Sequence, residues 1–597
     1  MSETFTSGSF PPSDYDRPAQ YDAIHCDKDV AVPMRDGVKL VIDVYRPDAP
    51  GKFPVLFAFG GHSKELQGSD YPIVFPPQPA WSSLWLGHME AGDTRYFVTR
   101  GYIHVIGAPR GMHKSEDGGS REWDSHDLLA WIAQQPWCDG NIGMVGIGAF
   151  AAEQYNLAKQ APALLKAIYP YDGRGAYGPM GGFREEYPGG VVHLFRYVQD
   201  HFSGVHQNKA GPGALSPDRE KLWQVAMENP DYRMYPQVMN VLAQKGQHMP
   251  RYFDVLIDPY DREETVRAGE AGAGKIAVPT AMGAGWYGYT YKSHPSGAEN
   301  YFRMVKAPKR LTFTGPSHLD RPLRAFRGDM LRWYDHWLRG NDTGMLNEPS
   351  VTYWAMGENA WRTASDWPLP ETQWTKLYLN SWERLTADPF KSSSVDDFIP
   401  PDAFVQMPPT QTNKVERLRF LTDPLPHDTL IAGPSVLNLF ASIDQDDTNW
   451  IVTLKDVGPD PSVRTAREGE REIRDDLFER ELTRGWLKAS HRALDPQRST
   501  PWKPWHPLTR EAQKPVVPGE VTAYSIEILA TANLFRAGHR ICIEIASADM
   551  PSGVSGATNI EYIPYHISSS RTILHKICHD AKHPSHLVLP VIPLAPA

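Results

Sequence analysis

Cysteine is scarce in this chain, with only 4 among 597 residues. Cys26, Cys138, Cys542 and Cys578 lie far apart and form no CxxC pair, so the sequence predicts neither a disulfide scaffold nor a thiolate metal site. A run of about 18 apolar residues, long enough to cross a membrane, is also lacking. The N-terminal region is polar and proline-rich, unlike a secretory signal peptide. We therefore expect a cytoplasmic protein.

A surplus of basic residues is missing as well. Lys and Arg number 61 against 71 Asp and Glu, which gives a net charge of −10. Binding to nucleic acid or to an anionic membrane would need a basic face. We expect a small-molecule substrate, no nucleic-acid or membrane partner, no metal and no cofactor, and we leave a homo-oligomer open.

Apolar runs and amphipathic stretches alternate in the first half of the chain. Runs at 54–59, 102–106 and 142–146 alternate with helical patterns at 125–135 and 149–160, which predicts a parallel sheet covered by helices. Beyond residue 347 the strands are separated by Pro, Gly and Asp turns, a pattern typical of a sandwich or jelly roll. The expected parts are a flexible N-terminal arm at 1–21, an α/β core at 22–172 and 276–352, a helical cap at 173–275 and a jelly-roll domain at 353–597.

Three other sequence patterns do not indicate a functional site. Residues 269–275 match GxxxxGK, but a charged helix precedes them and Ile276 follows, so we expect a flexible connector rather than a phosphate loop. The charged run 464–480 predicts a solvated helical insert. His193 and His201 have no carboxylate at ligand spacing, so we predict no metal site there.

The segment from Ile142 to Phe150 runs from an apolar strand into a helix through Gly146 and Gly148. That is the context of a nucleophile elbow. Further motifs follow in the order Arg110-Gly111, Gly285-Trp286-Tyr287, Gly315-Pro316-Ser317-His318, Arg332–Gly340 and Phe535–Arg540. Over residues 25–550 the chain resembles the CocE/NonD family of α/β-hydrolases, related to the X-prolyl dipeptidyl peptidases. The resemblance implies an α/β-hydrolase core with an inserted helical cap and a C-terminal jelly roll, and esters or amides as substrates.

The resemblance also implies a Ser-His-Asp triad that this chain lacks in part. Gly148 stands where the family has its serine, and Gly288 stands where its acid follows Gly-Trp-Tyr. His62 is at the place of the oxyanion-hole tyrosine, and His318 is in register with the family histidine. Without a hydroxyl at residue 148, no acyl-enzyme can form there.

Asp172, at the end of the strand after the elbow helix, is our candidate partner for His318, and Asp320 is a weaker one. The backbone N–H of Ala149 at the start of a helix remains a donor for a developing anion. Five aromatic residues around the expected site fit an apolar ligand, although each could instead be a core residue. They are Trp286, Tyr287, Tyr289, Tyr171 and Tyr177.

Three functions remain open at this point. The first is non-covalent acid–base catalysis on a small, largely apolar carbonyl compound, such as cyclisation, elimination or C–C cleavage, with His318 as base or acid. The second is ester or amide hydrolysis, either through water activated by His318 or in a protein inactivated by a Ser-to-Gly change. The third is a non-catalytic protein that binds a small molecule.

Overall fold

The computed structural model describes residues 15–60, 64, 90–177, 182–194, 215–247, 249–286, 293–315, 322–390, 399–459, 477–549 and 564–594. The chain forms two compact units. The first, called the α/β unit below, comprises Met1–Glu185, Glu264–Pro370 and Val554–Thr558. The second, called the β unit, comprises Glu186–Glu263, Glu371–Gly553 and Asn559–Ala597.

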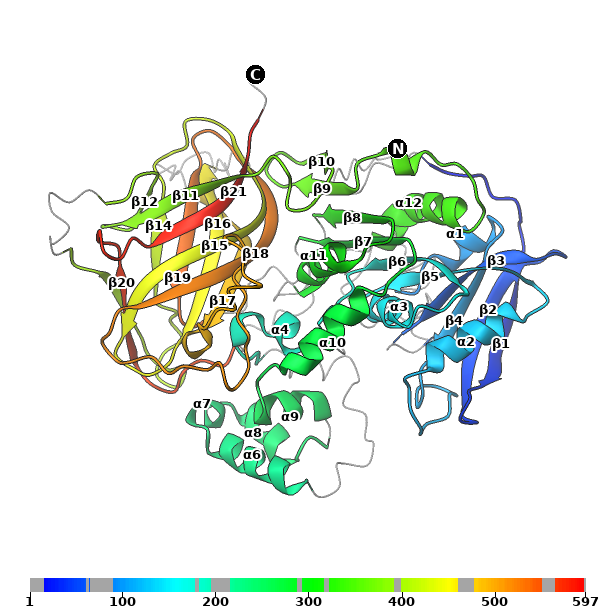
Figure 1. The fold of residues 1–597 in the computed structure, drawn as a ribbon, viewed down its shortest axis with the longest axis horizontal. Coiled ribbons are helices and arrows are strands. Elements are labelled where there is room, and N and C mark those ends of the chain that lie inside the picture. Colours follow the sequence, from blue (N-terminus) through cyan, green and yellow to red (C-terminus); the bar gives the residue numbers. More distant parts are fainter. Residues whose placement is uncertain are drawn as a thin grey trace, which may run out of the picture. The chain divides into compact units, whose positions relative to one another are not determined.

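In the described part of the α/β unit, ten strands form one sheet in the order β1-β2-β4-β3-β5-β6-β7-β8-β9-β10 (Figure 1). The neighbours from β4 to β9 pair in parallel, whereas β1–β2, β2–β4 and β9–β10 pair antiparallel. The strands are β1 Ile24–Pro33, β2 Lys39–Pro47, β3 Phe53–Phe59, β4 Ile103–Ala108, β5 Cys138–Ile147, β6 Leu165–Tyr171, β7 Thr280–Gly285, β8 Lys309–Thr314, β9 Val351–Ala355 and β10 Ala360–Ala364. The helices are α1 Thr94–Val98, α2 Asp124–Ala133, α3 Ala149–Lys159, α4 Gly182–Glu186, α10 Glu263–Ala273, α11 Ser293–Met304, α12 Pro322–Trp337 and the 3-10 turn η6 Met345–Asn347.

Every residue of β3 and β4 is buried, as expected for central strands of a sheet with both faces covered. Phe97 of α1 and Phe326 and Trp333 of α12 belong to one buried cluster with residues of the sheet. Helix α3 packs against β3, β5 and β6, and α11 packs against β7 and β8. The packing of α3 places its first residue, Ala149, at the carboxyl end of β5.

In the described part of the β unit, eleven strands form one sheet in the order β13-β20-β15-β18-β17-β16-β19-β14-β12-β11-β21 (Figure 1). Because β21 pairs with both β11 and β15, the sheet closes on itself, which leaves fewer exposed edges. The strands are β11 Gln373–Asn380, β12 Arg384–Thr386, β13 Asp402–Gln406, β14 Arg417–Leu421, β15 Thr429–Ile443, β16 Asn449–Pro459, β17 Leu477–Lys488, β18 Thr522–Phe535, β19 Arg540–Ala546, β20 Ile573–Cys578 and β21 His586–Ile592, with the 3-10 turn η8 Ala489–His491.

Four short helices of the β unit lie between β6 and β7 in sequence. They are α6 Pro217–Glu228, α7 Pro230–Arg233, α8 Pro236–Ala243 and α9 Pro250–Ile257, preceded by the 3-10 turn η4 Pro188–Gly190. Each helix begins with proline, which suits a position whose N–H has no intrahelical acceptor. Their buried residues form a cluster with Ile567. Asp231 of α7 accepts hydrogen bonds from the backbone N–H and the hydroxyl of Ser570, each at 2.7 Å.

The parallel sheet and the separate β-sheet confirm the two predicted sheet classes, but the boundaries differ. Strands β9 and β10 extend the first sheet past residue 352, and the second sheet begins only at Gln373. The segment 186–263, predicted as a cap on the core, forms one compact unit with the C-terminal sheet. Pairing between distant segments decides both boundaries, and local composition does not reveal it.

Three local predictions are corrected. Residues 15–21 are not a flexible arm, because Tyr15 and Arg17 hydrogen-bond to Asp335. These contacts are polar, so the sequence of this segment shows no apolar pattern that would predict its attachment. Helix α10 includes Gly269–Ala273, so the GxxxxGK segment is largely helical. Most of the charged run lies outside the described residues, and 477–480 belongs to strand β17 rather than to a helix.

Candidate active site

The carboxyl ends of the parallel strands lie along one edge of the sheet, where α/β proteins bind their ligands. Gly148 follows β5, Asp172 follows β6, and Trp286 follows β7. Neighbouring strands pair up to this edge, with Ile147 opposite Tyr171 and Gly285 opposite Thr314. The structure therefore brings these sequence-predicted positions to one edge. His62, Tyr287, Tyr289 and His318 lie outside the described residues, so their roles remain predictions.

Gly148 has φ +58° and ψ −117°, a conformation that side-chain-bearing residues rarely adopt. It is the N-cap of α3, and its carbonyl accepts the Ala152 N–H at 3.0 Å. Gly148 and Ala149 are partly exposed, between the buried residues Ile147 and Phe150. The chain thus keeps the sharp strand-to-helix turn of a nucleophile elbow while offering no hydroxyl.

A buried carboxylate, Glu90, lies beside this turn, and sequence reasoning missed it. Its backbone carbonyl accepts the N–H of Ile147 at 2.9 Å, and the residue is 7% exposed. A Cβ atom built on Gly148 would lie 3.4 Å from Glu90 Oε2. No local pattern marks Glu90, because its segment reaches the elbow only through the tertiary fold.

Asp172 is fully buried and has φ +54°, a strained value for a residue with a side chain. Its N–H donates to the Gly283 carbonyl at 2.8 Å, and its Oδ1 accepts the Gly285 N–H at 3.4 Å. Nδ1 of His294, on α11, lies 3.8 Å from the same oxygen. His294 is a second residue that sequence reasoning missed. The pairing of Asp172 with His318 stays a prediction.

The three described aromatic candidates are core residues. Trp286 is fully buried, donates its indole N–H to the Trp354 carbonyl at 2.8 Å and stacks on Phe313. Tyr171 shares a hydrogen bond of 2.6 Å with the Thr314 hydroxyl. Tyr177 is 4% exposed. Contact of these three residues with a substrate therefore stays a prediction, while their packing is observed.

Lys159 and Glu185 hold the segment after Asp172. Glu185 accepts the backbone N–H groups of Gly175 and Ala176 at 2.7 and 3.1 Å, and Lys159 donates to the Gly175 carbonyl at 2.5 Å. Burial raises the pKa of the Glu185 carboxyl to about 7 and lowers the pKa of the Lys159 ammonium to about 8. The backbone beside Asp172 is thus braced by two groups that titrate near neutrality.

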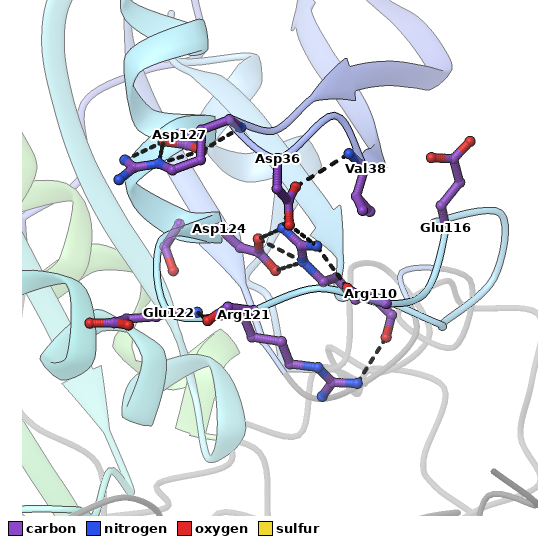
Figure 2. Close-up of polar contacts among 12 residues, drawn as sticks. Asp36, Val38, Arg110, Glu116, Arg121, Glu122, Asp124 and Asp127 are labelled. Atoms are coloured by element: carbon purple, nitrogen blue, oxygen red, sulfur yellow. Dashed lines mark hydrogen bonds and ion pairs between the residues drawn. The ribbon is translucent and has the colours of Figure 1, made fainter. Parts of the chain in front are cut away.

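Arg110 joins three segments behind the edge of the sheet (Figure 2). It follows β4 and is 2% exposed. Its guanidinium donates to Asp124 at the start of α2 at 2.6 and 2.9 Å and to Asp36 of the β1–β2 turn at 2.6 and 3.1 Å. The hydrogen bonds with Asp124 and Asp36 raise the pKa of Arg110. Arg110, which belongs to a family motif, therefore acts as a structural brace.

Lys64, two positions beyond His62 in sequence, is held by ion pairs. Its side chain is fully buried and donates to Asp29 at 2.8 Å and to Asp43 at 2.9 Å. Gly60 precedes this segment, and a Cβ there would approach Phe150 to 2.8 Å. Lys64 is therefore held by ion pairs, and Gly60 by close contact with α3.

Within the described ranges, no group of three or more His, Cys, Asp or Glu residues is arranged to hold a metal ion. No helix in the described part of the chain is long and apolar enough to span a membrane.

Two family models match the chain in order. Residues 36–320 match the X-Pro dipeptidyl-peptidase (S15 family), and residues 343–588 match the X-Pro dipeptidyl-peptidase C-terminal non-catalytic domain. The cocaine esterase of a Rhodococcus species is 27% identical over an alignment 621 positions long, which covers 94% of this chain and 98% of that protein.

Solved structures with low sequence identity share the fold. A CocE/NonD family hydrolase from Staphylococcus aureus gives a TM-score of 0.73 at 22% identity, over 96% of this chain and 94% of its own. An aminopeptidase from the marine sediment archaeon Thaumarchaeota archaeon gives 0.67 at 18% identity, over 97% and 99%. Together with the elbow geometry and the ordered family matches, these similarities show that the chain belongs to the CocE/NonD family of α/β-hydrolases, related to the X-Pro dipeptidyl-peptidases.

Proposed function

We propose that this hydrolase-family enzyme acts on a small, largely apolar carbonyl compound by non-covalent acid–base chemistry. The observation that carries the proposal is Gly148, which keeps the elbow conformation without a side chain. A carbonyl group bound above the elbow would meet the N–H of Ala149, at the start of an 11-residue helix. Cyclisation, elimination and C–C cleavage fit these groups, because none of them needs an acyl-enzyme.

His318 belongs to the proposal as a general base or acid, with Asp172 as its candidate orienting partner. Support for Asp172 comes from its complete burial and its strained backbone at the edge of the sheet. His62, which follows β3 in sequence, would polarise the substrate carbonyl.

Hydrolysis of an ester or amide is the second candidate, favoured by the similarity to a cocaine esterase and to the S15 family. In that case water would attack the carbonyl directly. Neither candidate forms a covalent intermediate at residue 148.

Pre-steady-state kinetics with p-nitrophenyl acetate and labelling by a serine-directed fluorophosphonate test the proposal. The wild-type protein is expected to show no burst and no label, because Gly148 has no hydroxyl. Gly148→Ser should gain both if the remaining hydrolase groups are in place. Gly148→Ala is the matched control, since it introduces the same backbone strain, about 1–3 kcal/mol, without a nucleophile.

A burst or a fluorophosphonate adduct in the wild-type protein would contradict the proposal. Peptide mass spectrometry of the fluorophosphonate adduct would then identify the residue that acts as nucleophile. Steady turnover of the ester without a burst would favour hydrolysis by water over the other acid–base reactions.

A further inference from the structure

We propose that Glu90 is an acid–base group of this site, in addition to His318, and that it abstracts a proton from the carbon next to the substrate carbonyl. This inference rests on the proposed function and names the residue that would perform it. The juxtaposition that suggests it is a carboxylate facing the place where the family serine would project.

The position of Glu90 is fixed through its backbone. Its carbonyl accepts the Ile147 N–H, which ties the residue to the last position of β5. Gly146 makes this approach feasible, because a Cβ at that residue would come within 3.0 Å of the Glu90 carbonyl oxygen. Gly146 is therefore needed for Glu90 to lie against the elbow.

The carboxylate itself faces Gly148. A Cβ built on Gly148 would lie 3.4 Å from Oε2, 3.8 Å from Cδ and 3.9 Å from Oε1. These are ordinary van der Waals distances, so a side chain at residue 148 would touch the carboxylate without displacing it. With glycine at this position, a substrate carbon that approaches the elbow in place of a side chain would come within reach of the carboxylate.

The start of helix α3 lies beside this place. The N-terminus of α3 begins at Ala149, and the partial positive charge of a helix N-terminus stabilises a nearby anion. Glu90 is 7% exposed, so little water competes for its carboxylate. The same helix N-terminus would stabilise the enolate oxygen formed from the substrate, through the Ala149 N–H.

The reaction balances without any co-reactant. Glu90 takes the proton, the C–H electron pair becomes the C=C bond of the enolate, and the carbonyl π pair moves to the oxygen. In the second step an electron pair on the enolate oxygen re-forms the carbonyl, and the C=C pair becomes a new double bond between the α- and β-carbons. The bond from the β-carbon to its hydroxyl or alkoxyl oxygen breaks, and its electron pair leaves with the oxygen. Glu90 gives its proton to that leaving group and is regenerated as carboxylate. The substrate class is therefore a carbonyl compound with an acidic α-hydrogen and a β-oxygen substituent.

Deuterium exchange tests the first step without knowledge of the natural substrate. Phenylacetone in D₂O, followed by proton NMR, is expected to lose its α-protons faster with the wild-type protein than in buffer. Glu90→Gln should reduce this exchange by about 100-fold or more, since positioned general bases contribute about 10²–10⁴. Glu153→Gln is the matched control, because Glu153 is a carboxylate of α3 that hydrogen-bonds to Ser125 and Asn156 and is not next to Gly148, and this variant should catalyse exchange like wild type.

Covalent labelling gives a readout that does not depend on the folding of a variant. The epoxide 1,2-epoxy-3-(4-nitrophenoxy)propane, which esterifies reactive carboxylates, is expected to label wild-type Glu90 in preference to Glu153 in peptide mass spectrometry. Absence of that ester together with absence of exchange overturns the assignment of Glu90.

The outcomes separate the two proposals. Exchange in Glu90→Gln within threefold of wild type, with no burst in the wild-type protein, would overturn the role of Glu90 and leave non-covalent catalysis standing. A burst and a fluorophosphonate adduct in the wild-type protein would overturn the proposed function itself.

Discussion

The backbone at Gly148 and the one at Gly146 restrict side chains for different physical reasons. At Gly148, with φ +58°, the atoms of the described residues nearest to an added Cβ belong to the Glu90 carboxylate, at 3.4 Å or more, so among these residues backbone strain is the main cost of a substitution. At Gly146 an added Cβ would lie 2.5 Å from the Phe150 Cβ, which adds a steric conflict. Substitutions at residue 148 can therefore probe chemistry, while those at residue 146 would disturb the fold.

The buried ion pair of Arg110 with Asp124 (Figure 2) can be compared with the exposed ion pair of Arg35 with Asp127. Arg110→Gln would leave Asp124, which is 2% exposed, without its charge partner, and we expect a loss of about 3–5 kcal/mol. Arg35→Gln is the control, because the Arg35 side chain that pairs with Asp127 is 48% exposed and such pairs contribute little. In thermal unfolding, the midpoint temperature of the first transition should be clearly lower for Arg110→Gln than for wild type. Arg35→Gln should lower that midpoint temperature very little. Equal shifts would contradict the role of Arg110 as a brace.

At the scale of an element, the segment 173–177 follows strand β6 and is held by hydrogen bonds from Lys159 and to Glu185. Tyr155 and Tyr301 lie behind it as a stacked pair with ring centroids 3.4 Å apart, and burial raises the pKa of both phenols well above the usual value. The segment therefore depends on charges in an apolar surrounding, where protonation has large effects.

We expect the stability of this segment to fall as the pH rises from about 4.5 to about 7. The folded pKa of Glu185 is about 7 against an ordinary 4.5, so between these values only the folded state holds the proton. The stabilisation is complete below pH 4.5 and is lost through pH 7, on the order of 3 kcal/mol. Urea unfolding between pH 5 and pH 7.5 should show this slope in wild type and in Glu122→Gln, an exposed control, and a weaker slope in Glu185→Gln. An unchanged slope in Glu185→Gln would contradict the assignment.

Sequence reasoning found elements where the pattern is local. The buried runs at 54–59 and 142–146 are β3 and β5, and the helix predicted at 149–160 is α3, Ala149–Lys159. It also placed Gly148 and Asp172 at the ends of strands. It missed Glu90 and His294, because each reaches the site through contacts across the fold that leave no periodic signal along the chain.

At the scale of the whole molecule, neither compact unit is one continuous stretch of the sequence. The segment 186–263 interrupts the α/β unit in sequence but forms a compact unit with the C-terminal sheet. Hydrogen bonds from the Ser568 N–H to the Tyr235 hydroxyl and from Ser570 to Asp231 tie the helices to residues more than 300 positions away. A sequence pattern predicts helices here, but the partner of those helices is fixed only by tertiary contacts.

This arrangement predicts that the helices α6–α9 and the segment 565–571 open together. Asp231→Ala removes the acceptor of the Ser570 N–H and hydroxyl, and because both residues are only partly buried we expect a loss of about 1 kcal/mol. Hydrogen exchange by mass spectrometry should then be faster both in the helices and in 565–571, while amides of β3–β8 keep their wild-type rates. Asp218→Ala is the control, because that side chain is 92% exposed and pairs only with Lys221. Faster exchange confined to α7 would show that the helices and the C-terminal segment are independent, whereas faster exchange throughout β3–β8 would show that the two compact units unfold as one.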